Sequence, residues 1–317
     1  MSVLPSPIIV LLTAVVSGNT TREPELADNW QASQCCVVNI NSSFFTEQMS
    51  ERTLDYFLSR GQIRSKDAAL IEWSHAANSK DRIAEALKGS CHMIEADLLM
   101  RDCHPKEPIM AHPPETDSDI TLQEWLKEVV KHRKGIKLDF KSLEAVAPSM
   151  VLLKEVWDHL HGPVWLNADI LPGPGGTAAP LDPQAFLDAI GTCSSHAVLS
   201  LGWTTGWTAD TTNPAYSWDN ICEMEEVCRT LKSPVTFPVR VALLAQSFCQ
   251  LKWLLQKSDR YTLTVWTGQH DKFEVQDLLR YRQEFGKHKI YYDLPDPQRQ
   301  WLPLLTLKPP VFSSPLV

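Results

Sequence analysis

The sequence has no excess of positive charge, no closely spaced cysteine pair and no hydrophobic run long enough for a membrane span. Its 30 Lys and Arg residues face 38 Asp and Glu residues, which gives a formal net charge of −8. That balance disfavours binding to double-stranded nucleic acid, because affinity for a phosphate backbone depends on basic clusters. An enzyme that cleaves a small phosphodiester is still compatible with it, since a metal ion and a few lysines can supply a local positive field.

None of the eight cysteines belongs to a C-x-x-C pair, so a zinc ribbon or a thioredoxin-like redox site has no support. Scattered cysteines are typically small buried side chains, although their even number leaves disulfides open in an oxidising compartment. The glycine-rich stretch Gly173-Pro174-Gly175-Gly176 lacks the Lys-Ser/Thr ending of a phosphate-binding loop. We therefore expect it to be an ordinary flexible loop.

The apolar run Pro7–Val16 is too short to cross a membrane but fits the core of a secretory signal peptide. No Lys or Arg precedes it, whereas signal peptides usually begin with positive charge. Two localisations follow: a secreted protein if this run is a signal-peptide core, or a cytoplasmic or organellar protein with a disordered extension. In either case we expect residues 1–48 to lie outside the fold.

The remaining chain alternates short β-rich runs with amphipathic helical runs. The predicted strands are Leu70–His75, His92–Asp97, Ile136–Phe140, Val164–Asp169, Ala197–Trp203, Val235–Arg240, Tyr261–Trp266 and Lys289–Asp293. The predicted helices are Asn78–Leu87, Leu122–His132, Ser149–Leu160, Pro183–Ile190, Asn220–Leu231, Gln246–Gln256 and Val275–Phe285, with Glu51–Leu58 closing the bottom of the structure.

Eight strands with seven intervening helices predict parallel pairing and an α/β fold, a TIM-type (β/α)8 barrel. An open doubly wound sheet is the alternative, but no glycine-rich fingerprint follows the first strand. We expect the barrel to span residues 49–300 and a Pro-rich tail to span residues 301–317. One barrel of about 250 residues accounts for a length that would otherwise suggest two domains.

Polar side chains gather where the predicted strands end, which is where such barrels carry their reactive groups. Alternation places Glu95 with Asp97 on one face of the second strand, and Lys137 with Asp139 and Lys141 on one face of the third. The three carboxylates are typical oxygen ligands for Mg²⁺ or Ca²⁺. The alternative to a metal site is that the three carboxylates form an ion-pair network with Lys137 and Lys141.

Two histidines lie close to this cluster in the predicted fold. His75 ends the first strand, and His112 follows Pro108-Ile-Met-Ala. Two histidines beside a metal can serve as general base and general acid. Trp203 and Trp266 end two further strands and could either pack at the rim or shield an organic group of a substrate.

These motifs together resemble the menorin family over about Met49 to Asp296. The motifs are Trp73-Ser-His75-Ala-Ala-Asn78, His92-Met-Ile-Glu95-Ala-Asp97, Pro108-Ile-Met-Ala-His112-Pro-Pro, Gly135-Ile-Lys-Leu-Asp139-Phe-Lys141, Trp165-Leu-Asn167-Ala-Asp-Ile-Leu and Thr236-Phe-Pro-Val-Arg240. Longer members of that family carry two menorin domains and a membrane anchor, and we expect a single-domain member without a transmembrane segment. The family is also associated with neuronal patterning outside the cell.

The menorin family is in turn similar to the glycerophosphodiester phosphodiesterase and phospholipase C-like barrels. The resemblance implies a metal site of Glu95, Asp97 and Asp139, with His75, His112 and Lys141 as catalytic residues. Those phosphodiesterases follow their first histidine with a phosphate-binding Arg, but the sequence here has Ala76. Substrate contacts must come from elsewhere, and the candidates are Asn78, Lys137, Asn167, Trp203, Arg240 and Trp266.

We therefore expect a phosphoric diester hydrolase or lyase that uses a divalent cation, Mg²⁺ before Ca²⁺. His75 would deprotonate water or a neighbouring substrate hydroxyl, and His112 would protonate the leaving oxygen. The expected partner is a small phosphodiester: a glycerophosphodiester, a lysophospholipid-like molecule, a nucleotide or a short RNA end. The alternative is a secreted, non-catalytic binding or patterning protein that retains the metal site and contacts extracellular proteins.

Overall fold

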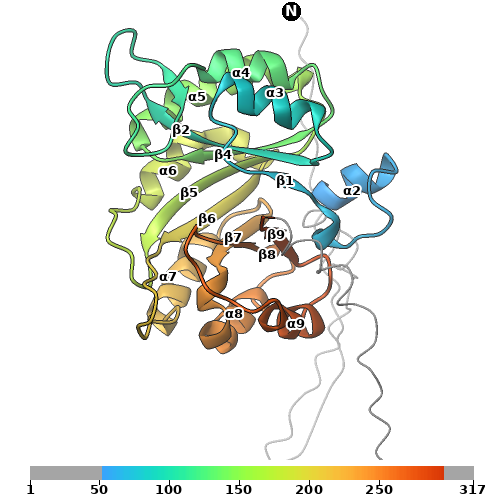
Figure 1. The fold of residues 1–317 in the computed structure, drawn as a ribbon, viewed down its shortest axis with the longest axis vertical. Coiled ribbons are helices and arrows are strands. Elements are labelled where there is room, and N and C mark those ends of the chain that lie inside the picture. The colour runs from blue at the N-terminus through green and yellow to red at the C-terminus, as the bar shows by residue number, and fades with distance from the viewer. Residues whose placement is uncertain (1–51, 296–317) are drawn as a thin grey trace, which may run out of the picture. The chain divides into compact units, whose positions relative to one another are not determined.

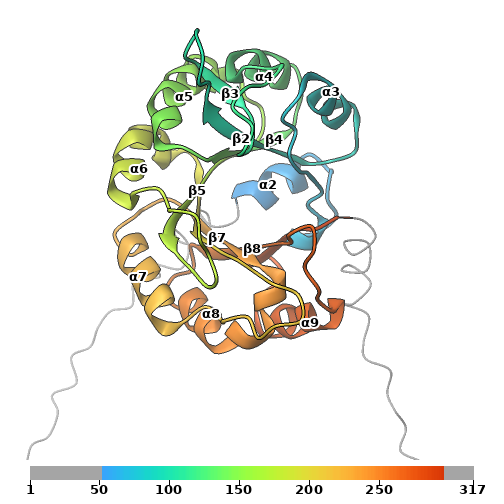
Figure 2. The same cartoon turned by 60° about the vertical axis from the view of Figure 1, so that its left-hand side comes forward.

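The computed structural model describes residues 52–295, and these form a nearly closed barrel of eight parallel strands (Figures 1 and 2). In sheet order the strands are β1 (Trp73–Ser74), β2 (Met93–Met100), β4 (Gly135–Phe140), β5 (Val164–Pro172), β6 (Val198–Thr204), β7 (Val235–Arg240), β8 (Tyr261–Trp266) and β9 (Ile290–Asp293). The predicted TIM-type barrel is confirmed. The expected N-terminal extension and the tail at 301–317 lie outside the described residues.

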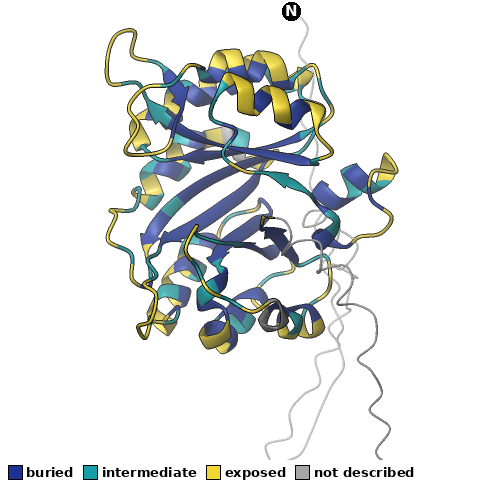
Figure 3. Ribbon diagram, in the orientation of Figure 1, coloured by how far each residue is buried: buried dark blue, intermediate teal, exposed yellow. Residues whose placement is uncertain are grey.

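Helices connect successive strands and cover the outside of the barrel. They are α3 (Lys80–Lys88), α4 (Leu122–Val129), α5 (Leu143–Val156), α6 (Pro183–Ile190), α7 (Trp218–Cys228), α8 (Phe248–Leu255) and α9 (Val275–Glu284), preceded by α2 (Arg52–Ser59). Short 3-10 turns complete them: η1 (Ala68–Leu70), η2 (Trp157–His159), η3 (Gly191–Ser195), η4 (Val241–Leu243) and η5 (Ala245–Ser247). Figure 3 shows the strands buried and the outer helix faces exposed.

The lower end of the barrel is filled by apolar side chains and covered by α2. Leu54 and Phe57 of α2 share a buried cluster with Met93, Trp165 and Tyr291, which lie at or near the first residues of their strands. Burial of such side chains stabilises the end of the barrel by the hydrophobic effect. This packing confirms that the helix before the first strand closes the end opposite the carboxyl ends of the strands.

The barrel has one seam. β1 and β9 lie at the two ends of the sheet, and no strand pairing joins them within residues 52–295. Below the strand ends, the Ala68 N–H donates to the carbonyl oxygen of Lys287 at 2.9 Å. Arg282 also forms a buried ion pair with Asp67, at 2.8 Å. At the upper end, His75 Nδ1 lies 2.9 Å from Asp293 Oδ2, so a side-chain contact crosses the seam there.

The prediction of a first strand over Leu70–His75 is mostly wrong. Residues Ala68–Leu70 form η1 instead, because the Asp67 carboxylate accepts a hydrogen bond from the Ala69 N–H and caps the turn. Only Trp73–Ser74 pairs as a strand, in parallel with β2. The Asp67 side chain therefore competes with extended backbone at the start of this segment.

Two other elements differ from the sequence-based expectation. A short strand, β3 (Pro108–Met110), pairs antiparallel with β2 and was not predicted. α5 begins at Leu143, six positions before the predicted start, and contains Pro148. A proline in the body of a helix is unfavourable, which explains why sequence pattern alone favoured a later start.

Six cysteines lie among the described residues, and none of them is in a disulfide. Cys228 is buried, Cys91 and Cys193 are partly buried, and Cys103, Cys222 and Cys249 are exposed. The expectation of buried cysteines therefore holds for only part of the set. In the same part of the chain, no helix is both long and apolar enough to cross a membrane.

Candidate functional site

The barrel interior near the carboxyl ends of the strands is polar, and strand register determines which groups meet there. Glu95 is level with Lys137, and Asp97 is level with Asp139 on the neighbouring strand. Asp139 is level with Asn167 on β5. All five side chains are buried. Burying this many polar groups is costly unless they are paired or bind a ligand.

Glu95, Asp97 and Asp139 form a candidate cation site. One oxygen of each carboxylate lies within 4.8 Å of the others. Glu95 Oε1 is buried and accepts no hydrogen bond. Burial raises the pKa of Glu95, although His75 opposes the shift. An unpartnered carboxylate oxygen beside two further carboxylates is the donor set that Mg²⁺ and Ca²⁺ prefer, so the residues fit a hard divalent cation.

The other carboxylate oxygens are held in place by neighbouring side chains. Lys141 Nζ bridges Asp139 at 2.7 Å and Asp97 at 3.2 Å. Asn78 Nδ2 donates to Asp97 at 2.8 Å, and Asn167 Nδ2 donates to Asp139 at 2.7 Å. These contacts orient the two aspartates in the way that outer groups orient metal ligands.

Lys137 adds a second buried positive charge at the centre of the site. Burial opposes its charge, but Glu95, Asp139 and Asp293 together raise the pKa of its ammonium group. The ion-pair alternative from the sequence is therefore partly correct, because both lysines compensate the carboxylates. It does not account for the unpartnered oxygen of Glu95.

His75 lies directly beside the carboxylates. Its Nδ1 is 2.9 Å from Asp293 and 3.3 Å from Glu95, while 60% of its side chain is exposed. Glu95 and then Asp293 raise the pKa of His75 to about 10. Because the ring is in contact with water, solvent screens part of this effect. The direction of the shift favours a protonated ring.

The backbone after His75 also belongs to the site. Ala76 has a φ of +54°, which is uncommon for a residue other than glycine. In this conformation the Ala76 N–H donates to Glu95 Oε2 at 2.7 Å. Ala76 therefore orients Glu95 through its backbone N–H. Strained backbone of this kind is most often found at functional sites.

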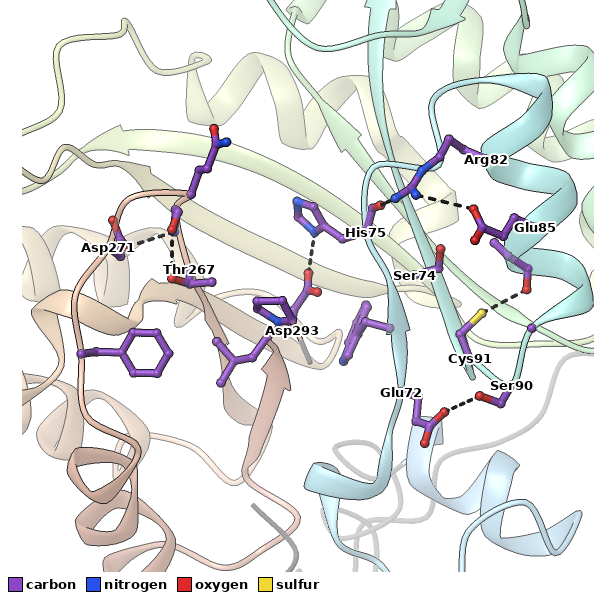
Figure 4. Close-up of a pocket in the computed structure, with 18 residues that line it drawn as sticks. Glu72, Ser74, His75, Arg82, Glu85, Ser90, Cys91, Thr267, Asp271 and Asp293 are labelled. Atoms are coloured by element: carbon purple, nitrogen blue, oxygen red, sulfur yellow. Dashed lines mark hydrogen bonds and ion pairs between the residues drawn. The ribbon is translucent and has the colours of Figure 1, made fainter. Parts of the chain in front are cut away.

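A cavity of about 990 Å³ opens along the seam beside His75 and Asp293 (Figure 4). On one side it is lined by β1 and α3, including Trp73, Ser74 and Arg82, and on the other by the loop after β8. Figure 4 shows His75 and Asp293 facing each other from the two sides. The histidine is therefore accessible from outside the barrel.

His112 lies on the rim at the end of β3 and is exposed. The preceding Ala111 N–H donates to the carbonyl oxygen of Asp97, which places the backbone at His112 close to Asp97. Its Nδ1 is 2.6 Å from the Pro113 carbonyl oxygen, so Nε2 is the atom available for proton transfer. Of the two histidines that were predicted to be catalytic, it is His75 that contacts a candidate metal ligand, Glu95, in the described part of the chain.

Several predicted substrate residues are engaged within the protein instead. Asn78 and Asn167 hold the aspartates of the candidate cation site, and Asn167 also accepts a hydrogen bond from Ser200. Arg240 binds Asp271 through two of its nitrogens, and its guanidinium lies 5.3 Å from the ring centre of Trp266. Trp266 is partly exposed.

Trp203 is the candidate that the structure separates from the site. It is fully buried, contacts Tyr216 and Phe237, and donates its indole N–H to the carbonyl oxygen of Asn220 in α7. The side chain therefore packs between the sheet and the helices. Trp203 is therefore not in a position to contact a substrate inside the barrel.

Two carboxylates of the site were absent from the predicted set. Asp293 at the end of β9 orients His75, and Asp169 in β5 lies near Lys141. Burial, with a smaller contribution from Asp139, raises the pKa of Asp169 to about 7. Both residues end predicted strands, and Asp169 shares its strand face with Asn167, so the alternation of β5 was the available signal.

Comparison with known proteins agrees with the motifs. Residues 67–299 match the family described as the Menorin N-terminal domain. The human protein FAM151B is 55% identical to the chain over 251 residues, which cover 78% of this chain and 91% of that relative.

Proposed function

This chain belongs to the menorin family, and we propose that it is a metal-dependent phosphodiesterase acting at the open end of its barrel. The observation that carries the proposal is the buried Glu95, Asp97 and Asp139 cluster, with one unpartnered oxygen, directly beside His75. Strongly perturbed titratable groups that meet in a barrel at the carboxyl ends of its strands are typical of active sites.

Glu95, Asp97 and Asp139 would hold the cation, with Mg²⁺ favoured and Ca²⁺ as the alternative. When bound, a divalent cation polarises a phosphoryl oxygen and offsets negative charge in the transition state. Lys141, already between Asp97 and Asp139, contributes positive charge to the same end of the site. Lys137 balances the carboxylates from below, and its full burial favours this role over direct substrate binding.

His75 and His112 would carry out proton transfer. Asp293 and Glu95 orient the His75 ring and stabilise its protonated form. As a base, His75 takes a proton from water or from a substrate hydroxyl, and Asp293 compensates the resulting charge. A cation held by Glu95 would offset the charge of that carboxylate and so would lower the pKa of His75, which favours the neutral ring that a base requires. His112 Nε2 would protonate the leaving oxygen.

The substrate would be a small phosphodiester, either a glycerophosphodiester or lysophospholipid-like molecule, or a nucleotide or RNA end. Trp266, backed by Arg240, offers a partly exposed aromatic surface at the rim. Such a surface can pack against the organic group of the substrate.

The test is a panel of phosphodiesters assayed with Mg²⁺, with Ca²⁺ and with a chelator. We expect metal-dependent turnover by the wild-type protein and at least a hundredfold loss in His75→Asn and in Glu95→Gln, which lies within the usual range for loss of acid–base catalysis. The exposed residues His161 and Glu223 supply matched controls, His161→Asn and Glu223→Gln, which should retain activity. Wild-type turnover that is unaffected by a chelator and by both site variants would refute the proposal.

A second candidate function is a non-catalytic binding protein that retains the metal site. It is favoured by the engagement of Asn78 with Asp97 and of Arg240 with Asp271, which leaves neither residue free for a phosphate. Metal binding without turnover of any member of the panel would support this function.

A further inference from the structure

On the basis of the proposed function, we propose that Asp169 binds a hydroxyl group next to the phosphate of the substrate. The site would thereby select phosphodiesters with a neighbouring hydroxyl, as a ribose or a glycerol provides. The geometry of β5 and β6 and the surroundings of Asp169 support this assignment.

Asp169 faces the barrel interior together with Asn167, two residues earlier on the same strand. The pairing of β5 with β6 shifts register between Asp169 and Leu171. Such bulges redirect side chains and are frequent next to active sites. The Leu181 N–H donates to the Asp169 carbonyl oxygen at 2.9 Å and fixes the backbone at this point.

The neighbouring strand leaves room for the carboxyl group. A side chain at Gly202 of β6 would place its Cβ 2.5 Å from Asp169 Oδ1 and 2.8 Å from Pro238. Only glycine therefore fits beside this carboxylate. Because Gly202 has no side chain, the Asp169 carboxyl group can lie directly against it.

Asp169 also differs from the other acids in what it contacts. Asp97 and Asp139 are held by asparagine and lysine side chains, and Asp293 is held by His75. Within residues 52–295, by contrast, no hydrogen bond or ion pair engages the Asp169 side chain. The residue as a whole is partly exposed, and its side chain lies on the inward face of β5 near the carboxyl end of the strand.

The chemistry of the neighbourhood defines the ligand. Asn167 is level with Asp139 on β4, and Asp169 and Lys141 each lie two positions further along the chain, so Asp169 lies on the same side of the site as Lys141 and the proposed phosphate position. An anionic oxygen would be repelled there, whereas a hydroxyl can donate a hydrogen bond to a carboxylate.

If that hydroxyl is the nucleophile, its oxygen forms the new bond to phosphorus while the bond to the leaving oxygen breaks. The single hydrogen of the hydroxyl turns from Asp169 to His75 and passes to His75 as the bond forms, and the leaving oxygen takes a proton from His112. The product is then a cyclic phosphate. Asp169 orients the hydroxyl and is unchanged at the end of the step.

The experiment measures binding and turnover of matched substrate pairs by the Mg²⁺-loaded protein. One pair is a ribodinucleoside monophosphate and its deoxyribose counterpart. The other is glycerophosphoethanolamine and the propyl ester of phosphoethanolamine, which lacks the glycerol hydroxyls. The proteins are wild type, Asp169→Asn, Asp169→Ala and the control Asp188→Asn, since Asp188 is exposed on α6.

We expect wild type and the control to bind the hydroxyl-bearing member of at least one pair roughly 10- to 100-fold more tightly, the range for a hydrogen bond to a charged group. The pair that shows the preference identifies ribose or glycerol as the source of the hydroxyl. Asp169→Ala should lose the preference while it binds the hydroxyl-free member as well as wild type does.

An unchanged preference in both Asp169 variants would overturn the inference, as would equal binding of the two members of each pair by wild type. Loss of Mg²⁺ binding in Asp169→Asn would also overturn it, because Asp169 would then be a metal ligand. Failure of the proposed function has a different signature. In that case no substrate is turned over, while the binding ratios still report on Asp169.

Discussion

At the scale of single residues, the site is built from carboxylates whose orientation is set by neighbouring amides and lysines. Ser200 donates to Asn167, and Asn167 donates to Asp139, which forms a chain of contacts across three neighbouring strands. Groups that orient metal ligands affect metal affinity although they do not touch the ion. Asn167 is therefore a positioning residue in this account.

Replacing Asn167 should weaken the metal site without removing a ligand. We expect Asn167→Ala to lower Mg²⁺ affinity by about 10- to 100-fold, the usual cost of losing an orienting partner. Calorimetric titration of Mg²⁺ measures this effect, with Asn213→Ala in the loop after β6 as the control. Equal affinities for wild type and Asn167→Ala would show that Asp139 needs no such support.

The raised pKa of Asp169 predicts that the stability of the metal-free protein depends on pH. Burial raises the pKa of this carboxyl group to about 7, whereas the pKa in an unfolded chain is about 4. Between these values the unfolded state releases the proton and the folded state keeps it, so stability falls as pH rises from about 4 to 7. Below this window the group is neutral in both states.

We expect Asp169→Asn to remove this fall in stability with rising pH. Its stability relative to wild type should therefore increase between pH values of about 4.5 and 8 and level off above that range. Urea unfolding in the presence of a chelator measures the difference. If the gap between the two proteins is constant across the range, the carboxyl group is not perturbed by burial.

The sequence was sufficient to predict most of the residues that meet in the site. Glu95, Asp97 and Asp139 were predictable because alternation and parallel register place them at one level of one barrel. The position of Trp203 was not predictable, because it depends on which face of β6 points into the barrel. Ser200 bonds to Asn167 inside the barrel, so Trp203, three positions on, lies on the opposite face.

At the scale of elements, α9 and the segment before β1 are linked by the buried pair Arg282 and Asp67. Both side chains are almost fully buried, and both guanidinium NH groups donate to the carboxylate. The same carboxylate caps η1, so one side chain fixes two elements next to the seam.

Removing this carboxylate should destabilise the fold without changing metal affinity. Asp67→Ala leaves Arg282 buried and unpaired, which costs about 3–5 kcal/mol in comparable cases. Urea unfolding measures the loss, and Mg²⁺ titration provides the second measurement. A loss below about 1 kcal/mol, the level of an exposed pair, would show that the pair contributes no more than a surface contact.

Elements with strong local patterns were predicted well, and those set by tertiary contacts were not. Pro183–Ile190 was predicted with its observed bounds, because Asp182 caps it and Pro183 begins it. β3 has only three residues and exists because it pairs with β2, which no local pattern reveals. The length of β1 was likewise determined by a turn upstream.

At the scale of the whole molecule, the seam between β1 and β9 distinguishes this barrel from a fully paired one. β1 has two residues and pairs on one side only, whereas β5 and β6 are each paired on both sides. We expect amides of β1 to exchange with deuterium faster than those of β5 and β6, because edge segments open at lower free energy. Equal protection of β1 and the central strands would show that the seam is closed in solution.

The candidate site gathers buried carboxylates and cationic groups in an acidic chain. The carboxylates of Glu95, Asp97, Asp139, Asp169 and Asp293 face the cationic groups Lys137, Lys141 and His75. A divalent cation would balance the remaining negative charge. The net charge of −8 therefore describes the molecule as a whole but not the local environment of the candidate site.

The most direct test of this account is calorimetric titration of Mg²⁺ and Ca²⁺ into chelator-treated protein. We expect the wild type and Glu223→Gln to bind one ion per chain, and we expect Glu95→Gln to lose that binding. A wild type that binds neither ion, or a Glu95→Gln variant that binds the ion with unchanged affinity, would contradict the presence of a cation site.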